Sequence, residues 1–290
     1  MKFGIHYSLG VGFTPTGDDY CRVAQRAEEL GYHSVWLGDH IVIPEKIAAP
    51  YPYTEDGSVG FPRRTPWPDP LVLLAAIGAK TQKIRLGTSV VIVPYRNPLH
   101  VAKAVATVDL VSNGRCLFGV GIGWLKEEFD ALGEKFSERA GRTREYLQIM
   151  KAIWQNEVAS FHGKYFSFSD LYTLPLPVQK PHPPIIFGGE SPAALKRVAD
   201  LGDGWQPGPV SLEVFRERVG QLKALMAERR RDFSQLSISM IGNAKELKQN
   251  PDKLAALEEL GVQEMILFMG APQVNATLAE LEEAAQALMS

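Results

Sequence analysis

The sequence predicts a (βα)8 barrel, an α/β fold, built as a single domain over residues 1–290. Apolar, β-branched runs alternate with helical patterns along the chain, and eight such pairs can be counted. Leu-Gly pairs recur just before three of the predicted strands, at Leu30, Leu201 and Leu260, which indicates a repeated unit. Parallel strands need both faces covered, and closure into a barrel removes the sheet edges. An open doubly wound sheet is the alternative, although such sheets usually have fewer strands.

The strands are predicted from their apolar and β-branched composition. They are expected at residues 3–9, 34–38, 84–93, 116–120, 184–187, 204–206, 236–241 and 264–268. Helices are expected between them. Apolar residues recur with a helical period over 18–30, and Gly31 is placed to end that helix in the left-handed conformation. Asn97 and Pro98 form a helix start, and Asn113-Gly114 a stop.

The later helices carry similar signals. Ser191-Pro192 repeats the start signal and Gly202 the stop. A further helix begins at about Leu212 and is expected to hold Arg229, Arg230 and Arg231 in its last turn, where cations suit the helix dipole. The last two helices are expected at residues 251–260 and 276–289.

Two stretches interrupt the alternation and are predicted to be insertions in βα loops. Residues 44–70 contain seven prolines and the aromatic residues Tyr51, Tyr53, Phe61 and Trp67, which disfavours regular structure. Long loops inside compact domains tend to be functional, so we expect a lid over a substrate; a plain surface loop is the alternative. Residues 161–183 are expected to form a hairpin rich in Phe and Tyr, followed by a proline-rich run.

The composition excludes several classes of partner. The chain has 31 Lys and Arg against 33 Asp and Glu, a net charge of −2. We therefore expect neither nucleic acid nor an anionic membrane as a partner, and we expect a small-molecule substrate. No apolar run reaches the roughly 18 residues of a membrane span, and the N-terminus lacks a signal-peptide pattern. Cys21 and Cys116 lack a C-x-x-C spacing, and the histidines lack metal-ligand spacing. A cytoplasmic protein without a metal site is therefore expected.

In a barrel enzyme the reactive side chains lie at the carboxyl ends of the strands. The second strand ends in Asp39-His40, and the imidazole can titrate near neutrality while a neighbouring carboxylate sets its charge state. A histidine merely packed at a loop start is the alternative. The third strand carries Ser89, and the fourth is followed by alternating glycines that include Gly121, beside which another molecule could approach the backbone. Trp124 stands where a dinucleotide fingerprint needs glycine, so a Rossmann motif is rejected.

The fifth strand is followed by Gly188-Gly189-Glu190-Ser191-Pro192. The two glycines let the backbone curl, and Ser191 caps a helix whose free N–H groups would face the rim, as in phosphate-binding turns. A plain glycine turn with a helix cap is the alternative.

Three long segments together resemble the luciferase-like monooxygenase superfamily, and most of all its branch of coenzyme F420-dependent oxidoreductases. They are SVWLGDHIVIP from Ser34, the stretch from Trp67 to Trp124, and PPIIFGGESPAALKRVADLGDGW from Pro183. The resemblance runs from Met1 to about Trp205. It implies a (βα)8 barrel that binds coenzyme F420, or alternatively FMN, at the carboxyl ends of its strands.

The resemblance also implies roles for individual residues. Ser89-Val90 matches a non-proline cis peptide against which the cofactor ring rests, and Gly121 lies in the neighbouring glycine-rich strand. Gly188, Gly189 and Ser191 match the phosphate-binding turn. Asp39 and His40 match the family's Asp-His pair, in which the histidine stabilises the reduced cofactor or assists proton transfer.

The activity implied is hydride transfer between C5 of a deazaflavin and an organic substrate. Relatives that oxidise glucose 6-phosphate carry Trp and Glu where this chain has Pro44 and Trp124, so sugar-phosphate oxidation is not expected. Trp124 and Trp67 indicate a rather apolar substrate pocket. Two alternatives remain: an FMN-dependent monooxygenase, and a cofactor-free lyase, isomerase or binding relative, which would need neither the cis peptide nor the Asp-His pair. Family members are commonly dimers, so a homodimer is possible.

Overall fold

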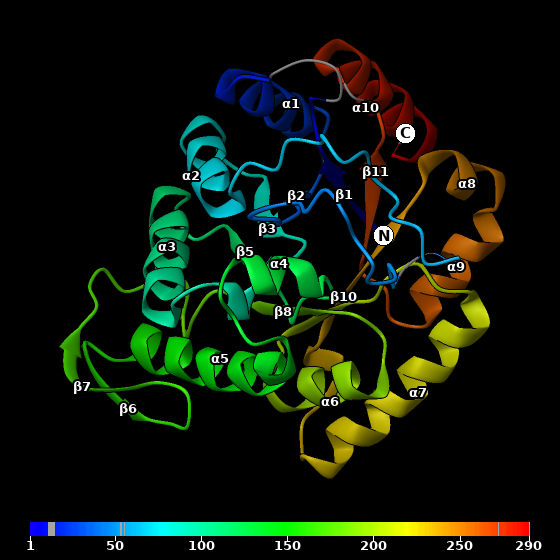
Figure 1. Cartoon of the computed structure of the whole chain (residues 1–290). Coiled ribbons are helices and arrows are strands. Elements are labelled where there is room, and N and C mark those ends of the chain that lie inside the picture. Colours follow the sequence, from blue (N-terminus) through cyan, green and yellow to red (C-terminus); the bar gives the residue numbers. More distant parts are fainter. Residues whose placement is uncertain (11–14, 53, 55, 272, 290) are drawn as a thin grey trace.

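Parallel strands occupy the centre of the molecule and helices surround them (Figure 1). The computed structural model describes residues 1–10, 15–52, 54, 56–271 and 273–289, so Tyr53 of the predicted lid lies outside the described residues. The strands of the described part are β1 Lys2–Tyr7, β2 Ser34–Leu37, β3 Arg85–Thr88, β4 Val91–Ile92, β5 Cys116–Gly121, β6 Val158–His162, β7 Ser167–Tyr172, β8 Ile185–Gly188, β9 Gly204–Gln206, β10 Ser237–Gly242 and β11 Glu264–Met269.

The strand order confirms the predicted barrel. The parallel sheet runs β3-β2-β1-β11-β10-β9-β8-β5-β4, and the additional pairing of β3 with β5 closes it. Each of the eight predicted strand segments contains a strand in the described part of the chain. The third predicted strand is divided into β3 and β4, because the backbone leaves the sheet at Ser89 and Val90.

Helices follow the strands around the barrel. Their bounds are α1 Gly17–Glu29, α2 Pro70–Lys80, α3 Pro98–Val111, α4 Lys126–Ala131, α5 Arg139–Gln155, α6 Pro192–Leu201, α7 Leu212–Glu228, α8 Ala244–Gln249, α9 Pro251–Glu259 and α10 Val274–Leu288, with short 3-10 turns at Val93–Tyr95, Phe136–Glu138 and Phe233–Gln235. The predicted starts are confirmed, since Asn97 and Ser191 each accept a hydrogen bond from a backbone N–H of the first turn.

One helix boundary differs from the prediction. α7 ends at Glu228, and Arg229 is its C-cap, so the three arginines lie at and beyond the end of the helix. Arg230 has φ of 54°, in the left-handed region, which ends the helical conformation there. Arg229 and Arg231 then bond to Asp200 and to the carbonyl groups that end α6.

The barrel interior is filled in layers. Near the amino ends of the strands, Ser34 and Glu264 are hydrogen-bonded across the interior, and a side chain at Gly4 would collide with both. The next layer is apolar and contains Trp36, Leu117, Ile186 and Ile266. Because strand side chains alternate between two faces, the residues two positions further along the strands lie at the carboxyl ends, where barrel sites are built.

The two predicted insertions lie between β2 and α2 and between α5 and β8. In the described residues of 44–70 no helix or strand forms before α2 begins at Pro70. The segment crosses the strands in the view of Figure 1. The second insertion contains the β6–β7 hairpin, which begins slightly earlier than predicted, at Val158, and projects beyond α5. Glu145 of α5 holds the hairpin by accepting three backbone hydrogen bonds from residues 164–166.

Among the described residues, no helix combines the length and apolar character that crossing a bilayer requires.

Candidate functional site

His40 follows β2 at the carboxyl end of the barrel and is held by a side chain that the sequence did not single out. Its Nδ1 atom lies 2.7 Å from Oε2 of Glu128, a residue of α4. The imidazole side chain is 10% exposed and the Glu128 side chain is fully buried. The other ring nitrogen, Nε2, has no hydrogen-bond partner within the described part of the chain.

The surroundings of Glu128 decide which nitrogen of His40 carries hydrogen. Oε1 accepts the backbone N–H groups of Ile41 at 2.7 Å and Val42 at 3.2 Å, and Oε2 accepts the hydroxyl of Tyr95 at 3.0 Å. These three neighbours are donors, so an ionised carboxylate accepts from all of them and from His40 Nδ1–H. Burial and the negative charge of Glu128 raise the pKa of Tyr95 well above its usual range, so Tyr95 stays a donor. His40 therefore presents Nε2 as an acceptor.

Asp39 does not contact His40, which corrects the expectation that its carboxylate sets the charge state of the imidazole. Its oxygens accept from Arg96 Nη1 at 2.6 Å, from Arg96 Nη2 at 2.8 Å and from the Ile92 backbone N–H at 2.9 Å. Asp39 therefore faces the β4 segment, whereas His40 faces Glu128 of α4. In this structure Asp39 holds the backbone, and Glu128 is the carboxylate beside His40.

The peptide bond between Ser89 and Val90 is cis, as the resemblance implied. The Ser89 N–H donates to the Leu37 carbonyl at 2.7 Å, and its hydroxyl lies 2.5 Å from Oε1 of Gln206. Gln206 is buried at the end of β9 and was not predicted. A single polar residue in a short strand is the signal that would have found it, because the rest of that strand is glycine and tryptophan.

The glycines of β5 and β8 make room for the protein's own backbone and side chains. A Cβ atom at Gly121 would lie 2.5 Å from Val90 Cγ2, and one at Gly188 would lie 3.1 Å from Val90 Cγ1. At Gly119 a Cβ would collide with the Thr88 carbonyl oxygen. The group that approaches the backbone at Gly121 is therefore the Val90 side chain of the protein itself. Gly121 and Gly188 lie behind Val90, which belongs to the surface predicted to contact the cofactor ring.

The turn after β8 has the predicted shape. Gly189 has φ of 91°, a conformation that favours glycine, and its carbonyl accepts from Trp205 Nε1 at 2.8 Å. Ser191 caps α6 by accepting from the Ala194 N–H at 3.2 Å. The amino end of α6 is thus held at the barrel rim, with its positive dipole end toward the loops of the site.

Two arginines, Arg139 of α5 and Arg197 of α6, lack anionic partners among the described residues and were missed by the sequence analysis. Nε of Arg139 is buried without a hydrogen-bond partner among the described residues. Arg197 of α6 makes no hydrogen bond or ion pair in the described part of the chain, and burial, followed by the charges of Arg139 and Arg144, lowers its pKa. Arg139 opens α5, where the helix dipole disfavours a cation, and that placement was the available signal. Together they can hold an anion.

Aromatic rings surround the imidazole of His40. Trp67 lies edge-on at 5.0 Å between ring centroids, Phe61 at 5.4 Å and Trp124 at 6.5 Å. Tyr51 lies 5.1 Å from Trp124. Trp67 also fills the space beside Gly38, where a Cβ would lie 2.7 Å from its ring. The two tryptophans predicted to line a pocket, Trp67 of the inserted segment and Trp124 of the loop after β5, thus both lie beside His40.

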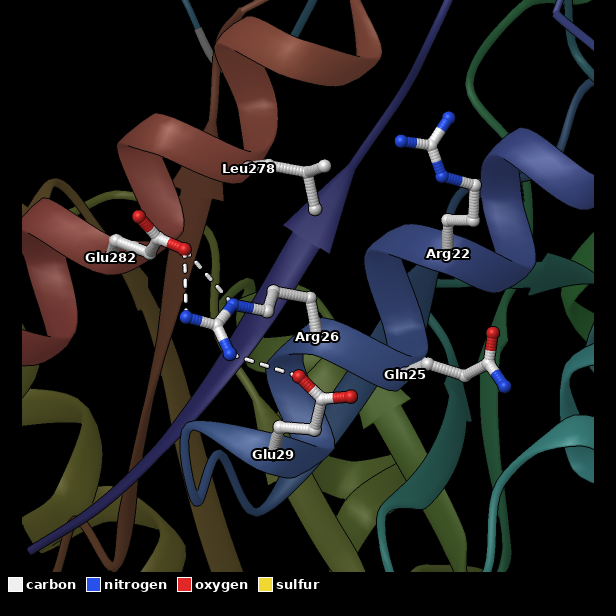
Figure 2. A pocket seen from close by; sticks show the side chains of 6 residues that line it. All are labelled: Arg22, Gln25, Arg26, Glu29, Leu278 and Glu282. Carbon is white, nitrogen blue, oxygen red and sulfur yellow. Dashed lines mark hydrogen bonds and ion pairs between the residues drawn. The ribbon is translucent and has the colours of Figure 1, made fainter.

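A groove of about 300 Å³ lies elsewhere, between α1 and α10 on the outside of the barrel (Figure 2). Arg26 crosses it and forms ion pairs with Glu29 at 2.9 Å and Glu282 at 2.7 Å. The two carboxylates neutralise the charge of Arg26, and none of the predicted site residues lines the groove. Over the described residues, no group of three or more His, Cys, Asp or Glu side chains is arranged to hold a metal ion.

The comparison with protein families decides what this barrel is. The family model described as luciferase-like monooxygenase matches residues 1–287. The chain belongs to this family. Its members are oxidoreductases and monooxygenases that use F420 or FMN, so this luciferase-like protein is an oxidoreductase by family.

Several relatives of this luciferase-like protein are similar over different shares of the chain. An uncharacterised protein of Mycobacterium tuberculosis is 33% identical over 285 residues, covering 98% of this chain and 99% of that protein. The F420-dependent glucose-6-phosphate dehydrogenase of Amycolatopsis mediterranei is 33% identical over 206 residues, covering 68% of this chain and 56% of that enzyme. The FMNH2-dependent dimethylsulfone monooxygenase of Pseudomonas putida is 34% identical over 155 residues, covering 52% and 42%.

Solved structures share the barrel of this luciferase-like protein. The monooxygenase RslO1 from Streptomyces bottropensis superposes with a TM-score of 0.80 at 23% identity, covering 100% of this chain and 99% of that one. The coenzyme F420-dependent tetrahydromethanopterin reductase of Methanopyrus kandleri does so with a TM-score of 0.76 at 17% identity, covering 99% and 98%. At these identities the likeness concerns the fold.

Proposed function

We propose that this protein is an F420-dependent oxidoreductase that transfers hydride between C5 of the deazaflavin and a small, rather apolar organic substrate. The observation that carries the proposal is the His40–Glu128 pair. It places an imidazole of defined tautomer at the carboxyl end of the barrel, with Nε2 free to exchange a proton. The F420-dependent relative that is 33% identical over 68% of this chain supports the choice of cofactor.

The residues of the turn after β8 fit a cofactor that carries phosphate. Gly189 curls the backbone, and the capped helix start at Ser191 points its positive end toward the site. Arg139 and Arg197 supply two cations without anionic partners, and Arg139 Nε is a buried donor that lacks an acceptor. Ser89 and Val90, with Gly121 and Gly188 beside Val90, form the surface on which the ring would rest.

When bound, the deazaflavin supplies the hydride chemistry, and the chain supplies position and proton control. Glu128 fixes the ring orientation of His40 and keeps hydrogen on Nδ1. Nε2 can then take a proton from a substrate hydroxyl or return one to a carbonyl oxygen. Glu128 remains the hydrogen-bond acceptor of Nδ1–H throughout this exchange. Asp39 and Arg96 hold the backbone at Ile92, two residues beyond Val90.

The aromatic rings around His40 indicate the substrate class. Tyr51, Phe61, Trp67 and Trp124 offer apolar faces, and the His40 side chain is only 10% exposed. Pro44 has no polar side-chain atom, and Trp124 lacks the carboxylate that the sugar-phosphate enzymes carry at its position. The proposed substrate is therefore an apolar molecule with one hydroxyl or carbonyl group placed toward His40.

A second candidate is an FMNH2-dependent monooxygenase, which the relative from Pseudomonas putida favours. The same turn and the same arginines would hold the phosphate of FMN. In that reaction His40 would serve beside reduced flavin and oxygen, with the substrate in the same aromatic surroundings. The choice between the two candidates depends on which cofactor the protein binds.

The first experiment is a fluorescence titration of the purified protein with F420, with FMN and, without oxygen, with reduced FMN. Tight binding of F420 with FMN ignored is the expected result. Preference for reduced FMN would replace the proposal with the second candidate, and binding of neither would overturn both.

Arginine variants test the phosphate-binding role in the same titration. Arg139→Gln should weaken F420 binding about 10-fold or more, since a hydrogen bond to a charged group is lost. Arg144→Gln is the matched control, because Arg144 is half exposed and paired with Asp200 at 2.6 Å. A deazaflavin without the phosphate-bearing side chain should bind wild type and Arg139→Gln equally. Equal F420 affinity in all three proteins would contradict the phosphate role.

A further inference from the structure

A second histidine, His6, lies in the floor of the site. It belongs to β1 and is in register with Trp36 of β2 and Phe268 of β11. Gly4, two residues earlier, faces the interior against Ser34 and Glu264, so alternation places the His6 side chain on the same interior face. It therefore lies one layer nearer to the carboxyl ends of the strands.

The ring of His6 marks the boundary between the core and the open end of the barrel. It stacks on Phe268 with 5.7 Å between ring centroids and 23° between planes. His6 is 8% exposed, whereas Phe268 is 47% exposed. The Ser89 backbone lies near the His6 ring. A molecule resting on Ser89 and Val90 would thus lie over His6.

His6 is the polar side chain of this layer that lacks a partner. Its Nδ1 atom is buried and makes no hydrogen bond in the described part of the chain. The neighbouring polar side chains satisfy one another, because the Ser89 hydroxyl bonds to Gln206 at 2.5 Å and Gln206 Nε2 reaches Ser239 Oγ at 3.4 Å. Buried polar atoms are nearly always paired, so Nδ1 is an atom that a bound molecule would be expected to contact.

The charge state of His6 limits what that partner can be. Burial lowers the pKa of His6 to about 4, so the imidazole is neutral at pH 7. A neutral imidazole has one N–H donor and one nitrogen acceptor. It suits an uncharged N–H or C=O group of a planar heterocycle better than a phosphate or carboxylate, which the arginines near α6 are placed to meet.

We propose that His6 is a ligand-binding residue whose Nδ1 forms a hydrogen bond with an N–H or C=O group of the cofactor ring system. This inference rests on the proposed function, because it needs a ring bound at Ser89 and Val90. In this proposal His6, in the barrel interior, recognises the cofactor ring, and Arg139 of α5 and Arg197 of α6 recognise the phosphate.

The test is a pair of variants at this position and one control. His6→Phe keeps an aromatic ring against Phe268 and removes both nitrogens, whereas His6→Asn places an amide near the position of Nδ1. His33→Asn is the control, because burial lowers the pKa of His33 to about 4 as well, and His33 lies just before the amino end of β2. Each protein is titrated with F420 and with the deazaflavin that lacks the phosphate-bearing side chain, and its unfolding temperature is measured without ligand.

His6→Phe should weaken binding of both ligands about fivefold to tenfold, as expected for loss of one hydrogen bond. Its unfolding temperature without ligand should change little, because Phe keeps the ring contact with Phe268 and Nδ1 has no partner to lose among the described residues. His6→Asn should recover part of the affinity, and His33→Asn should bind like wild type. The role of His6 would be overturned if His6→Phe bound with unchanged affinity, or if a lower unfolding temperature accounted for its weaker binding. Either result would leave the proposed function intact. Failure of wild type to bind any cofactor would overturn the proposed function with it.

Discussion

Oε2 of Glu128 lies 2.7 Å from Nδ1 of His40, although the two residues are separated by 88 positions in the chain. The carboxylate also accepts the two backbone N–H groups that follow His40. One buried side chain therefore fixes both the imidazole and the first residues of the loop that leads into the inserted segment. The orientation of the proposed proton-transfer group and the position of this loop are linked through α4.

Glu128→Gln should lower turnover about 100-fold, within the range that general acid-base groups contribute. The amide nitrogen would face Nδ1 as a donor and favour the tautomer with hydrogen on Nε2. The measurement is kcat as a function of pH, with the redox cofactor that the protein binds. Glu127→Gln is the control, because Glu127 contacts the backbone of residues 48 and 49 and not His40. Equal turnover in Glu128→Gln and Glu127→Gln would remove Glu128 from the mechanism.

Asp39→Asn should destabilise the fold by about 3 kcal/mol, because it leaves the guanidinium of Arg96 without its buried partner. Urea unfolding measures this change. Asp69→Asn tests the exposed partner of the same arginine, at 3.1 Å, and should cost less than about 1 kcal/mol. Asn keeps the helix cap that Asp69 provides for α2. Equal losses in the two variants would show that Asp39 has no special structural role.

Phe61→Ala should expose the imidazole of His40, since Phe61 packs against both His40 and Trp67. Diethylpyrocarbonate modification followed by mass spectrometry reports the reaction rate of each histidine. The rate at His40 should rise severalfold, while that at His162 in the β6–β7 hairpin serves as the internal reference. An unchanged rate at His40 would show that the inserted segment is an ordinary surface loop.

Gly189→Ala should lower the free energy of unfolding by about 1 kcal/mol, because φ of 91° is unfavourable for a residue with a Cβ atom. It should also weaken binding of the phosphate-bearing cofactor by distorting the turn. Gly220→Ala is the control within α7, where no atom lies within 4 Å of the added Cβ, and it should stabilise the protein slightly. Unchanged affinity in Gly189→Ala would make the turn purely structural.

Glu264→Gln should change how stability depends on pH. Burial raises the pKa of Glu264 from 4.5 to about 7, so between these values the folded protein binds more protons than the unfolded chain. The contribution of Glu264 is therefore present below pH 4.5 and lost as the pH rises through 7, by about 3 kcal/mol in all. His6 and His33 titrate in both proteins, so the difference between wild type and variant isolates Glu264. Urea unfolding at several pH values should show wild type losing stability relative to the variant; parallel curves would contradict the raised pKa.

Much of the fold could be predicted because its signals are local. Most barrel strands are short apolar runs, and the helix starts at Asn97 and Ser191 are each a pair of neighbouring residues. Such signals need no knowledge of the rest of the chain, and their number and order indicate a closed barrel. The cis peptide at Ser89-Val90 and the turn at Gly189 were also found from contiguous residues, through the family resemblance.

The partners within the site could not be predicted in this way. The sequence places Asp39 next to His40, yet the carboxylate that reaches the imidazole is Glu128. Gln206 meets Ser89 across 117 positions, and Arg139 and Arg197 come from different helices. Hydrogen bonds depend on direction and on distances of about 3 Å, and barrel closure sets these between strands far apart in the chain. The sequence by itself determined the barrel, the family and the residues at the strand ends. Only the tertiary structure decided which of those residues touch, because contact requires the closed sheet that brings their strands together.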